Sequence, residues 1–291
     1  MTESNRINRQ DTRNTQPMLQ IDIEKILKNR VKSKGFARLP SFLFKGLASI
    51  ICQDELNRVL REAYPLQGEE FAAKAIETLG VTVESVGLDM IPSGRYIFAS
   101  NHPLGGLDGM ALIATLAGHF GPDSVRFPVN DMLMNVTPLA GVFTPLNKYG
   151  AQGREAAAAL NEAFASSRQI AMFPAGLVSR LQPDGSIADL KWQKAFVGKA
   201  LEYDRAIVPV FIEALNRPRF YKTALWRKKL GIGVNIEQVL LPSELCHARG
   251  MKIRIIFGSP ITPDELRAEK ISPALLAAKI RLLSDALRPS R

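Results

Sequence analysis

The chain of 291 residues has little cysteine and no long hydrophobic run. Cys52 and Cys246 are its two cysteines, too few for a disulfide framework, so we expect a protein of a reducing compartment. The first twenty residues are polar, which excludes an ordinary secretory signal. The most apolar uncharged window, residues 109–122, is 14 residues long, whereas a membrane-spanning helix needs about 20. We therefore expect no export by that route and no span of the bilayer.

Acidic residues are scarce relative to basic ones. The chain has 38 Lys and Arg against 28 Asp and Glu, which gives a formal net charge of +10. Hydrophobic residues make up 46% of it, which excludes a disordered chain and predicts a packed core. The positive charge favours an anionic partner. Composition alone leaves phospholipid headgroups, nucleic acid and an acidic carrier protein open.

The order of the apolar runs predicts an α/β fold. Runs typical of buried strands occupy residues 95–100, 125–129, 169–173, 207–212 and 252–257. Segments of helical composition alternate with them at residues 108–119, 153–166 and 191–203. Ser272 and Pro273 then form a helix start, and Leu276, Ile280, Leu283 and Leu287 follow on one face. We predict a largely parallel central sheet flanked by helices, with ligand sites at the carboxyl ends of its strands.

The N-terminal part divides into two predicted segments. Residues 1–20 have almost nothing to bury, and we expect a mobile polar tail. Residues 21–70 are predicted to form a basic and apolar helical element, because seven bases and one acid between residues 24 and 45 lead into a run of apolar side chains. This element either packs on the core with a solvated basic edge or is an amphipathic membrane contact made by Phe42, Phe44 and Lys45. Residues 71–291 are expected to form the main domain.

The most informative segment is residues 99–109, Ala-Ser-Asn-His-Pro-Leu-Gly-Gly-Leu-Asp-Gly, between a predicted strand and a predicted helix. Asp108 can orient His102 through one ring nitrogen, leaving the other to take a proton from a hydroxyl. Alternatively, Asp108 caps the helix and His102 is a turn residue. The chain has no Gly-x-Ser-x-Gly elbow, Walker loop or zinc-ligand spacing. We therefore expect no metal and no bound cofactor, and general-base catalysis by His102 is the remaining simple chemistry.

Three further segments follow in order: residues 149–155 with Arg154, residues 170–180 with Phe-Pro-Ala-Gly and Arg180, and Val-Pro-Val at residues 208–210. Together with the first, over residues 95–211, they resemble the four blocks of the lysophospholipid (glycerolipid) acyltransferase superfamily. The resemblance implies an O-acyltransferase with His102 and Asp108 as its catalytic dyad. It also implies a co-substrate, an acyl thioester of acyl carrier protein or coenzyme A.

The resemblance implies roles for further residues. Arg154 and Arg180 correspond to the acceptor-binding cations, and Gly176, in the same block as Arg180, is also expected to bind the acceptor. The backbone N–H groups of Gly105 and Gly106 are weaker candidates for stabilising the oxyanion.

Two differences from the family pattern bear on the acceptor. Five residues rather than the usual four separate His102 from Asp108, and Ala175 stands where the family has Glu. This pattern resembles the branch first described as hemolysins, which includes O-acyltransferases of ornithine and glycine lipids. The implied acceptor is a lyso-amino-acid lipid, whose carboxylate an Arg would bind. Lysophosphatidic acid is the alternative acceptor, and a non-catalytic lipid-binding protein on the same scaffold is the alternative class.

A second basic segment, residues 216–236, has six bases and no acid, interleaved with aromatic side chains. Such interleaving occurs in membrane-surface and in nucleic-acid-binding proteins, and a solvated helix is also open. No nucleic-acid fold motif accompanies it, so we favour an anionic membrane or acyl carrier protein and expect no nucleic acid. Arg227, Lys228 and Lys229 are the predicted membrane contacts. These interpretations predict a peripheral enzyme on the cytoplasmic face of a bacterial inner membrane.

Overall fold

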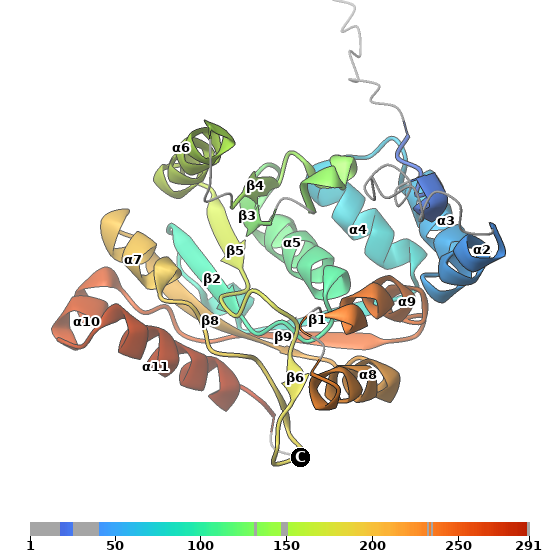
Figure 1. Cartoon of the computed structure of the whole chain (residues 1–291). Helices are drawn as coiled ribbons and strands as arrows, with labels where there is room; N and C mark the ends of the chain where they lie inside the picture. Colours follow the sequence, from blue (N-terminus) through green and yellow to red (C-terminus); the bar gives the residue numbers. More distant parts are fainter. Residues whose placement is uncertain are drawn as a thin grey trace, which may run out of the picture.

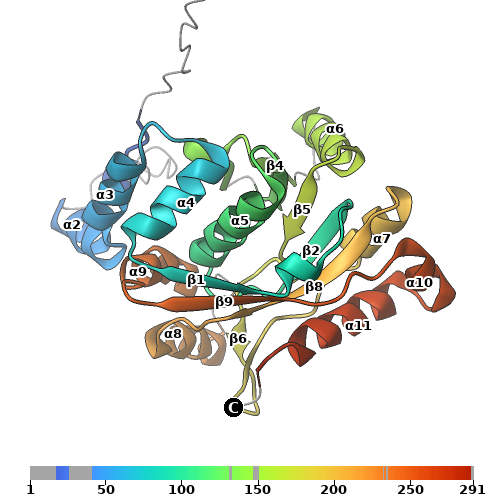
Figure 2. The ribbon, with the colours of Figure 1, turned by 180° about the vertical axis from the view of Figure 1, so that it is seen from behind.

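Helices cover both faces of one central sheet (Figures 1 and 2). The computed structural model describes residues 18–25, 41–130, 133–146, 151–231, 233 and 235–289. The sheet has seven strands in the order β1-β9-β8-β2-β5-β3-β4. They are β1 (Thr82–Val86), β2 (Tyr96–Ser100), β3 (Val125–Val129), β4 (Phe143–Pro145), β5 (Gln169–Met172), β8 (Ala206–Glu213) and β9 (Lys252–Phe257).

The pairing confirms the predicted fold class. Every neighbouring pair of strands in this sheet is parallel except β8 and β9, which are antiparallel. All five predicted strands are present. β6 (Arg180–Leu181) and β7 (Ile187–Ala188) form a separate two-stranded ribbon. Because β2 lies between β5 and β8, the loop that follows β2 emerges at the middle of the sheet.

Ten helices of the described chain surround the sheet. They are α2 (Ser41–Ile50), α3 (Gln53–Ala63), α4 (Gly68–Thr78), α5 (Gly106–Phe120), α6 (Ala151–Ala165), α7 (Ala195–Glu202), α8 (Pro218–Lys229), α9 (Leu241–Cys246), α10 (Pro263–Ala268) and α11 (Pro273–Ala286). Short 3-10 turns include η4 (Thr137–Leu139) and η5 (Ile236–Leu240). Alternating side chains of β2 face opposite layers, since Phe98 packs with α4 and α5 whereas Ile97 packs with α6, α7 and α11.

The last helix starts as predicted and buries the predicted face over its first turns, but not at Leu283. Ser272 accepts a hydrogen bond from the Leu275 N–H and caps α11. Leu276 and Ile280 are buried, whereas Leu283 is exposed. Ser284 takes the buried place, and its hydroxyl donates to the carbonyl of Val210 on β8. A small polar residue with a backbone partner thus replaces the expected leucine at the sheet.

The N-terminal element is only partly described. Residues 1–17 and 26–40, which hold most of the predicted tail and basic run, lie outside the described residues, as does the side chain of Phe42. Phe44 is 4% exposed, so its ring lies in the interior and not at the expected membrane contact. Lys45 is exposed.

The described part of residues 21–70 is continuous with the main core. Ile21 exchanges two hydrogen bonds with the Asn57 amide on α3, at 2.8 and 2.9 Å. Val59 and Leu60 of α3 join the same apolar cluster as α4, α5 and the sheet. No helix in the described ranges combines the length and apolar character that crossing a bilayer demands.

Candidate active site

The loop that carries the candidate base His102, residues 101–105 and here called the catalytic loop, is anchored where β2 ends. The Asn101 side chain donates to the carbonyl of Ile212 at 3.0 Å and accepts from the Ile212 N–H at 2.6 Å. This pair of bonds joins the end of β2 to β8. His102 therefore follows a fixed point of the sheet, and α5 begins four residues later.

His102 and Asp108 lie together as predicted. His102 Nδ1 is 3.1 Å from Asp108 Oδ2, and Asp108 is 0% exposed. The same carboxylate accepts the N–H groups of Leu104 at 2.7 Å and Gly109 at 2.9 Å. Because a carboxylate is the acceptor in these bonds, Nδ1 of the neutral imidazole carries the proton and Nε2 has the free lone pair. The His102 side chain is 15% exposed, so a substrate can reach it.

Gly105 makes the turn between His102 and Asp108. Its φ of 95° belongs to the region that side-chain-bearing residues rarely adopt. Its N–H donates to Asp108 at 3.3 Å, so this group is engaged and does not serve as the expected oxyanion donor. Gly106 begins α5, whose first N–H groups have no acceptor within the helix.

Phe173 holds the imidazole from one side. Its ring stacks on His102 with centroids 4.0 Å apart and an interplanar angle of 14°. Phe127 of β3 in turn meets Phe173 edge to face at 5.2 Å. The stack restricts rotation of the His102 ring, so it keeps Nδ1 directed at Asp108.

Asp189 holds the backbone of the catalytic loop. Its Oδ1 accepts the His102 N–H at 3.1 Å and the Ser179 hydroxyl at 2.6 Å, and its Oδ2 accepts the Trp192 indole N–H at 2.9 Å. The Ser179 N–H donates to the His102 carbonyl at 2.7 Å. Burial raises the pKa of Asp189, and these hydrogen bonds oppose the rise. Sequence reasoning missed Asp189 and Ser179, because no local pattern distinguishes them from ordinary loop residues.

The Phe-Pro-Ala-Gly segment forms a tight turn. Gly176 has a φ of 70°, is exposed, and donates its N–H to the Phe173 carbonyl at 3.0 Å. Ala175 is buried in the apolar cluster that includes Trp192. The position where the family has Glu is therefore apolar here. The turn returns the chain so that Ser179 meets the catalytic loop.

Arg180, which the resemblance assigned to acceptor binding, is paired with a carboxylate in the interior. It is buried, its guanidinium lies 3.0 Å from Glu237 Oε1 and donates to the Val178 carbonyl at 2.7 Å, and it lies over the Phe220 ring. Burial lowers the pKa of Arg180, and Glu237 opposes that effect. Arg227 Nε is 2.9 Å from the other oxygen of Glu237, which turns this side chain inward and away from the predicted membrane contact. Both arginines therefore hold Glu237 in place.

The remaining predicted residues lie at the surface. Arg154 is exposed in the first turns of α6, which follows the edge strand β4, three places from β2 in the sheet. Lys228 and Lys229 are exposed at the end of α8.

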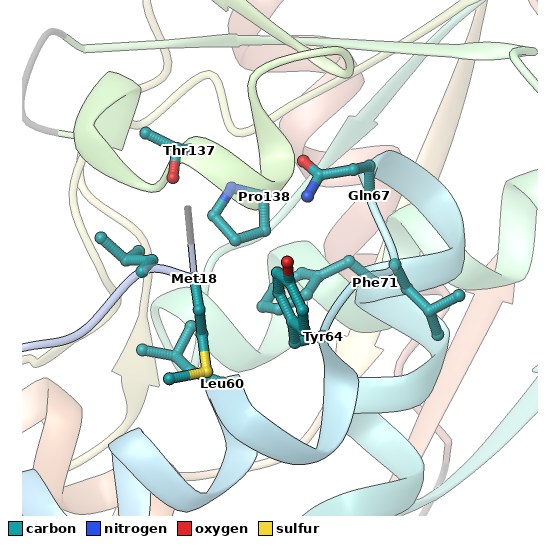
Figure 3. A pocket seen from close by; sticks show the side chains of 9 residues that line it. Met18, Leu60, Tyr64, Gln67, Phe71, Thr137 and Pro138 are labelled. Atoms are coloured by element: carbon teal, nitrogen blue, oxygen red, sulfur yellow. The ribbon is translucent and has the colours of Figure 1, made fainter. Parts of the chain in front are cut away.

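A small hollow lies away from the dyad. It is lined by Met18, Leu60, Tyr64, Phe71 and Pro138, among others (Figure 3). The start of α4 borders it, and nearby Glu69 accepts the N–H groups of residues 123 and 125 at the beginning of β3. The hollow therefore opens at the amino edge of the strands, opposite the edge that carries His102.

Known proteins are similar to this chain in sequence or in structure. The family model described as acyltransferase matches residues 25–275. A lyso-glycine lipid O-acyltransferase of Phocaeicola vulgatus is 42% identical over 242 residues, covering 83% of this chain and 86% of that protein. The protein of the same name from Bacteroides thetaiotaomicron is 39% identical over 242 residues, covering 83% and 88%. The solved 1-acyl-sn-glycerophosphate acyltransferase PlsC of Thermotoga maritima aligns with a TM-score of 0.46 and 17% identity, over 86% of this chain and 95% of that one.

Proposed function

The chain belongs to the acyltransferase family, and from this premise we propose that it acylates the hydroxyl of a lyso-amino-acid lipid. The observation that carries the proposal is the pair of His102 and Asp108, 3.1 Å apart at the carboxyl end of a central strand. A base at this place, with one ring nitrogen free, can activate an alcohol.

The reaction requires one base and an activated acyl group. His102 Nε2 takes the proton of the acceptor hydroxyl as its oxygen attacks the thioester carbonyl carbon. The new C–O bond forms, the C–S bond breaks, and the imidazolium returns the proton to the leaving thiolate. The Asp108 carboxylate stabilises the positive charge on His102 between these two steps. The proposed reaction steps involve no metal and no redox cofactor.

The proposed acceptor is the lyso form of a glycine lipid, a 3-hydroxyacyl amide with a free carboxylate. The names of the two relatives support this acceptor. The buried Ala175 supports it as well, because the Glu that the family uses with a glycerol phosphate is absent. Arg154 is the proposed cation for the carboxylate, since Arg180 is committed to Glu237.

The proposed donor is an acyl thioester of acyl carrier protein or coenzyme A. Both carriers are anionic, which suits a chain of net charge +10. The acceptor is a membrane lipid, so we place the enzyme peripherally at the cytoplasmic face of the inner membrane, where such thioesters are made.

The test supplies purified protein with three acceptors and both donors, and identifies products by mass spectrometry. The acceptors are lyso-glycine lipid, lyso-ornithine lipid and lysophosphatidic acid. We expect transfer to the amino-acid lipids, and its loss in His102→Ala. His119→Ala is the matched control, because His119 is exposed at the far end of α5. Preference for lysophosphatidic acid would overturn the acceptor, and full activity of His102→Ala would overturn the mechanism.

A further inference from the structure

The outward face of α8 carries exposed apolar and basic side chains. Phe220, Tyr221 and Ala224 face the interior. With 100° of rotation per residue, five side chains share an arc of about 100° on the outward side. They are Arg219, Lys222, Trp226, Lys229 and Leu230, here called the α8 stripe, and all five are exposed.

The stripe combines large apolar side chains with cations. Trp226 is 68% exposed and Leu230 is 63% exposed, at positions four residues apart. Among the described residues, no carboxylate forms an ion pair with Arg219, Lys222 or Lys229. The three cations and the indole therefore have no partner of their own within the described chain.

We propose that the α8 stripe docks on the headgroup region of an anionic membrane. Tryptophan is enriched at this level of a bilayer, leucine enters the acyl boundary, and Lys and Arg attract anionic lipids. An acidic carrier protein would use the cations but would leave Trp226 and Leu230 without an apolar environment. The stripe differs from the sequence prediction, because Arg227 turns to Glu237 and Lys228 points to the opposite side of the helix.

The stripe is joined to the catalytic loop. Asn216, just before α8, donates from its side chain to the Pro103 carbonyl at 3.0 Å, and its N–H donates to the Tyr221 hydroxyl at 3.1 Å. Pro103 is the neighbour of His102 in the chain. Asn216 thus ties the start of α8, the helix that carries the stripe, to the loop that is proposed to receive the lipid hydroxyl. This proposal rests on the proposed function for its choice of a lipid surface.

The test measures co-sedimentation of the full chain with phosphatidylcholine vesicles, with and without phosphatidylglycerol. The variants are Trp226→Ala and Lys222→Glu. Their matched controls are Leu282→Ala on α11, an apolar residue that is 67% exposed, and Lys252→Glu at the exposed start of β9. We expect each stripe variant to weaken binding to the anionic vesicles at least fivefold, and each control to bind like the wild type.

Two outcomes would overturn the proposal. One is wild-type vesicle binding by both stripe variants when their thermal unfolding is unchanged. The other is loss of binding to purified acyl carrier protein in Lys222→Glu while vesicle binding is kept. His102→Ala distinguishes a failure of this proposal from a failure of the proposed function. We expect this variant to bind vesicles like the wild type, whatever the acylation assays with the three acceptors show.

Discussion

The Asp108 carboxylate contacts the His102 imidazole, the proposed base, and also accepts hydrogen bonds from the backbone around it. One oxygen faces His102 Nδ1 and the Leu104 N–H, and the other faces the Gly109 N–H. The alternatives of catalytic partner and helix cap are therefore not exclusive here. In the proposed mechanism Asp108 fills both roles, because its place in the first turn of α5 brings its carboxylate to His102 Nδ1.

Asp108→Asn is expected to lower kcat by about 10²–10⁴-fold, because the amide favours the wrong His102 tautomer. It should also lower stability, since the new NH₂ group faces at least one N–H that now donates to Asp108. Steady-state rates and urea unfolding measure the two effects. A kcat within threefold of the wild type would show that orientation by Asp108 is unimportant.

Asp189 is expected to contribute by holding the backbone of His102 in position. In Asp189→Asn, oxygen can still accept from His102 and Ser179, but the NH₂ group then meets the buried Trp192 N–H. We expect a loss of about 1–3 kcal/mol in the free energy of unfolding. Trp192→Phe removes the opposing donor, so the same substitution should cost less in that background. Equal costs in both backgrounds, measured by urea unfolding, would contradict this account.

At the scale of elements, a fully buried arginine joins α6 to the sheet. Arg205 donates to the carbonyls of Phe164 and Arg168 at 2.7 Å, and to those of Ala163, Ser166 and Tyr96. Three of these carbonyls belong to the end of α6 or follow it directly, where a helix lacks internal donors. Burial lowers the pKa of Arg205 to about 10, so the side chain stays charged at neutral pH.

Arg205→Met is expected to destabilise the fold by about 3–5 kcal/mol, because several buried carbonyls lose their donor at once. Arg205→Lys should be nearly as harmful, since one ammonium cannot reach all of them. Thermal and urea unfolding measure both variants. Arg267→Met is a control, because Arg267 lies half exposed on α10 and makes surface ion pairs. A loss below 1 kcal/mol in Arg205→Met would refute the capping role.

The sequence predicts the buried elements well and the exposed ones poorly. β2 and β8 are continuous apolar runs, because parallel central strands are covered on both faces. β1 (Thr82–Val86) escaped notice because its side chains are mostly exposed at the sheet edge. α7 begins at Ala195 rather than at residue 191, because residues 189–193 form an irregular segment in which Asp189 bonds the catalytic loop and Trp192.

In the candidate site, contacts between residues close in the sequence were easier to predict than contacts between distant ones. His102 and Asp108 lie within seven consecutive residues, so the local sequence offers the pair as one of two alternatives, and the family resemblance favours it. The fate of Arg180 depends on Glu237, which is 57 residues away. No motif reveals that a cation is already paired with a carboxylate from a distant turn. The family block therefore could not show that the Arg180 guanidinium is already engaged by Glu237.

At the scale of the whole molecule, excess positive charge and paired carboxylates together set the response to acid. Hydrogen bonds from Arg168 and Arg126 lower the pKa of Asp123, and Arg58 lowers that of Glu55. A carboxyl group whose pKa is lower in the folded than in the unfolded state stabilises the fold at pH values above its unfolded-state pKa. This contribution is lost as the pH falls through the folded-state pKa. The contribution of Asp189 to the pH dependence of stability has the opposite sign, because burial raises its pKa and so favours the folded state at low pH.

We therefore expect the melting temperature to hold between pH 7 and 5 and to fall below about pH 4, where carboxylates with depressed pKa values take up protons. Protonation also raises the net charge above its neutral-pH value of +10, so self-repulsion adds to the loss. Scanning calorimetry across this range measures the effect, and Asp123→Asn should reduce its size. A melting temperature that rises toward pH 3 would mean that buried groups such as Asp189 outweigh the surface pairs.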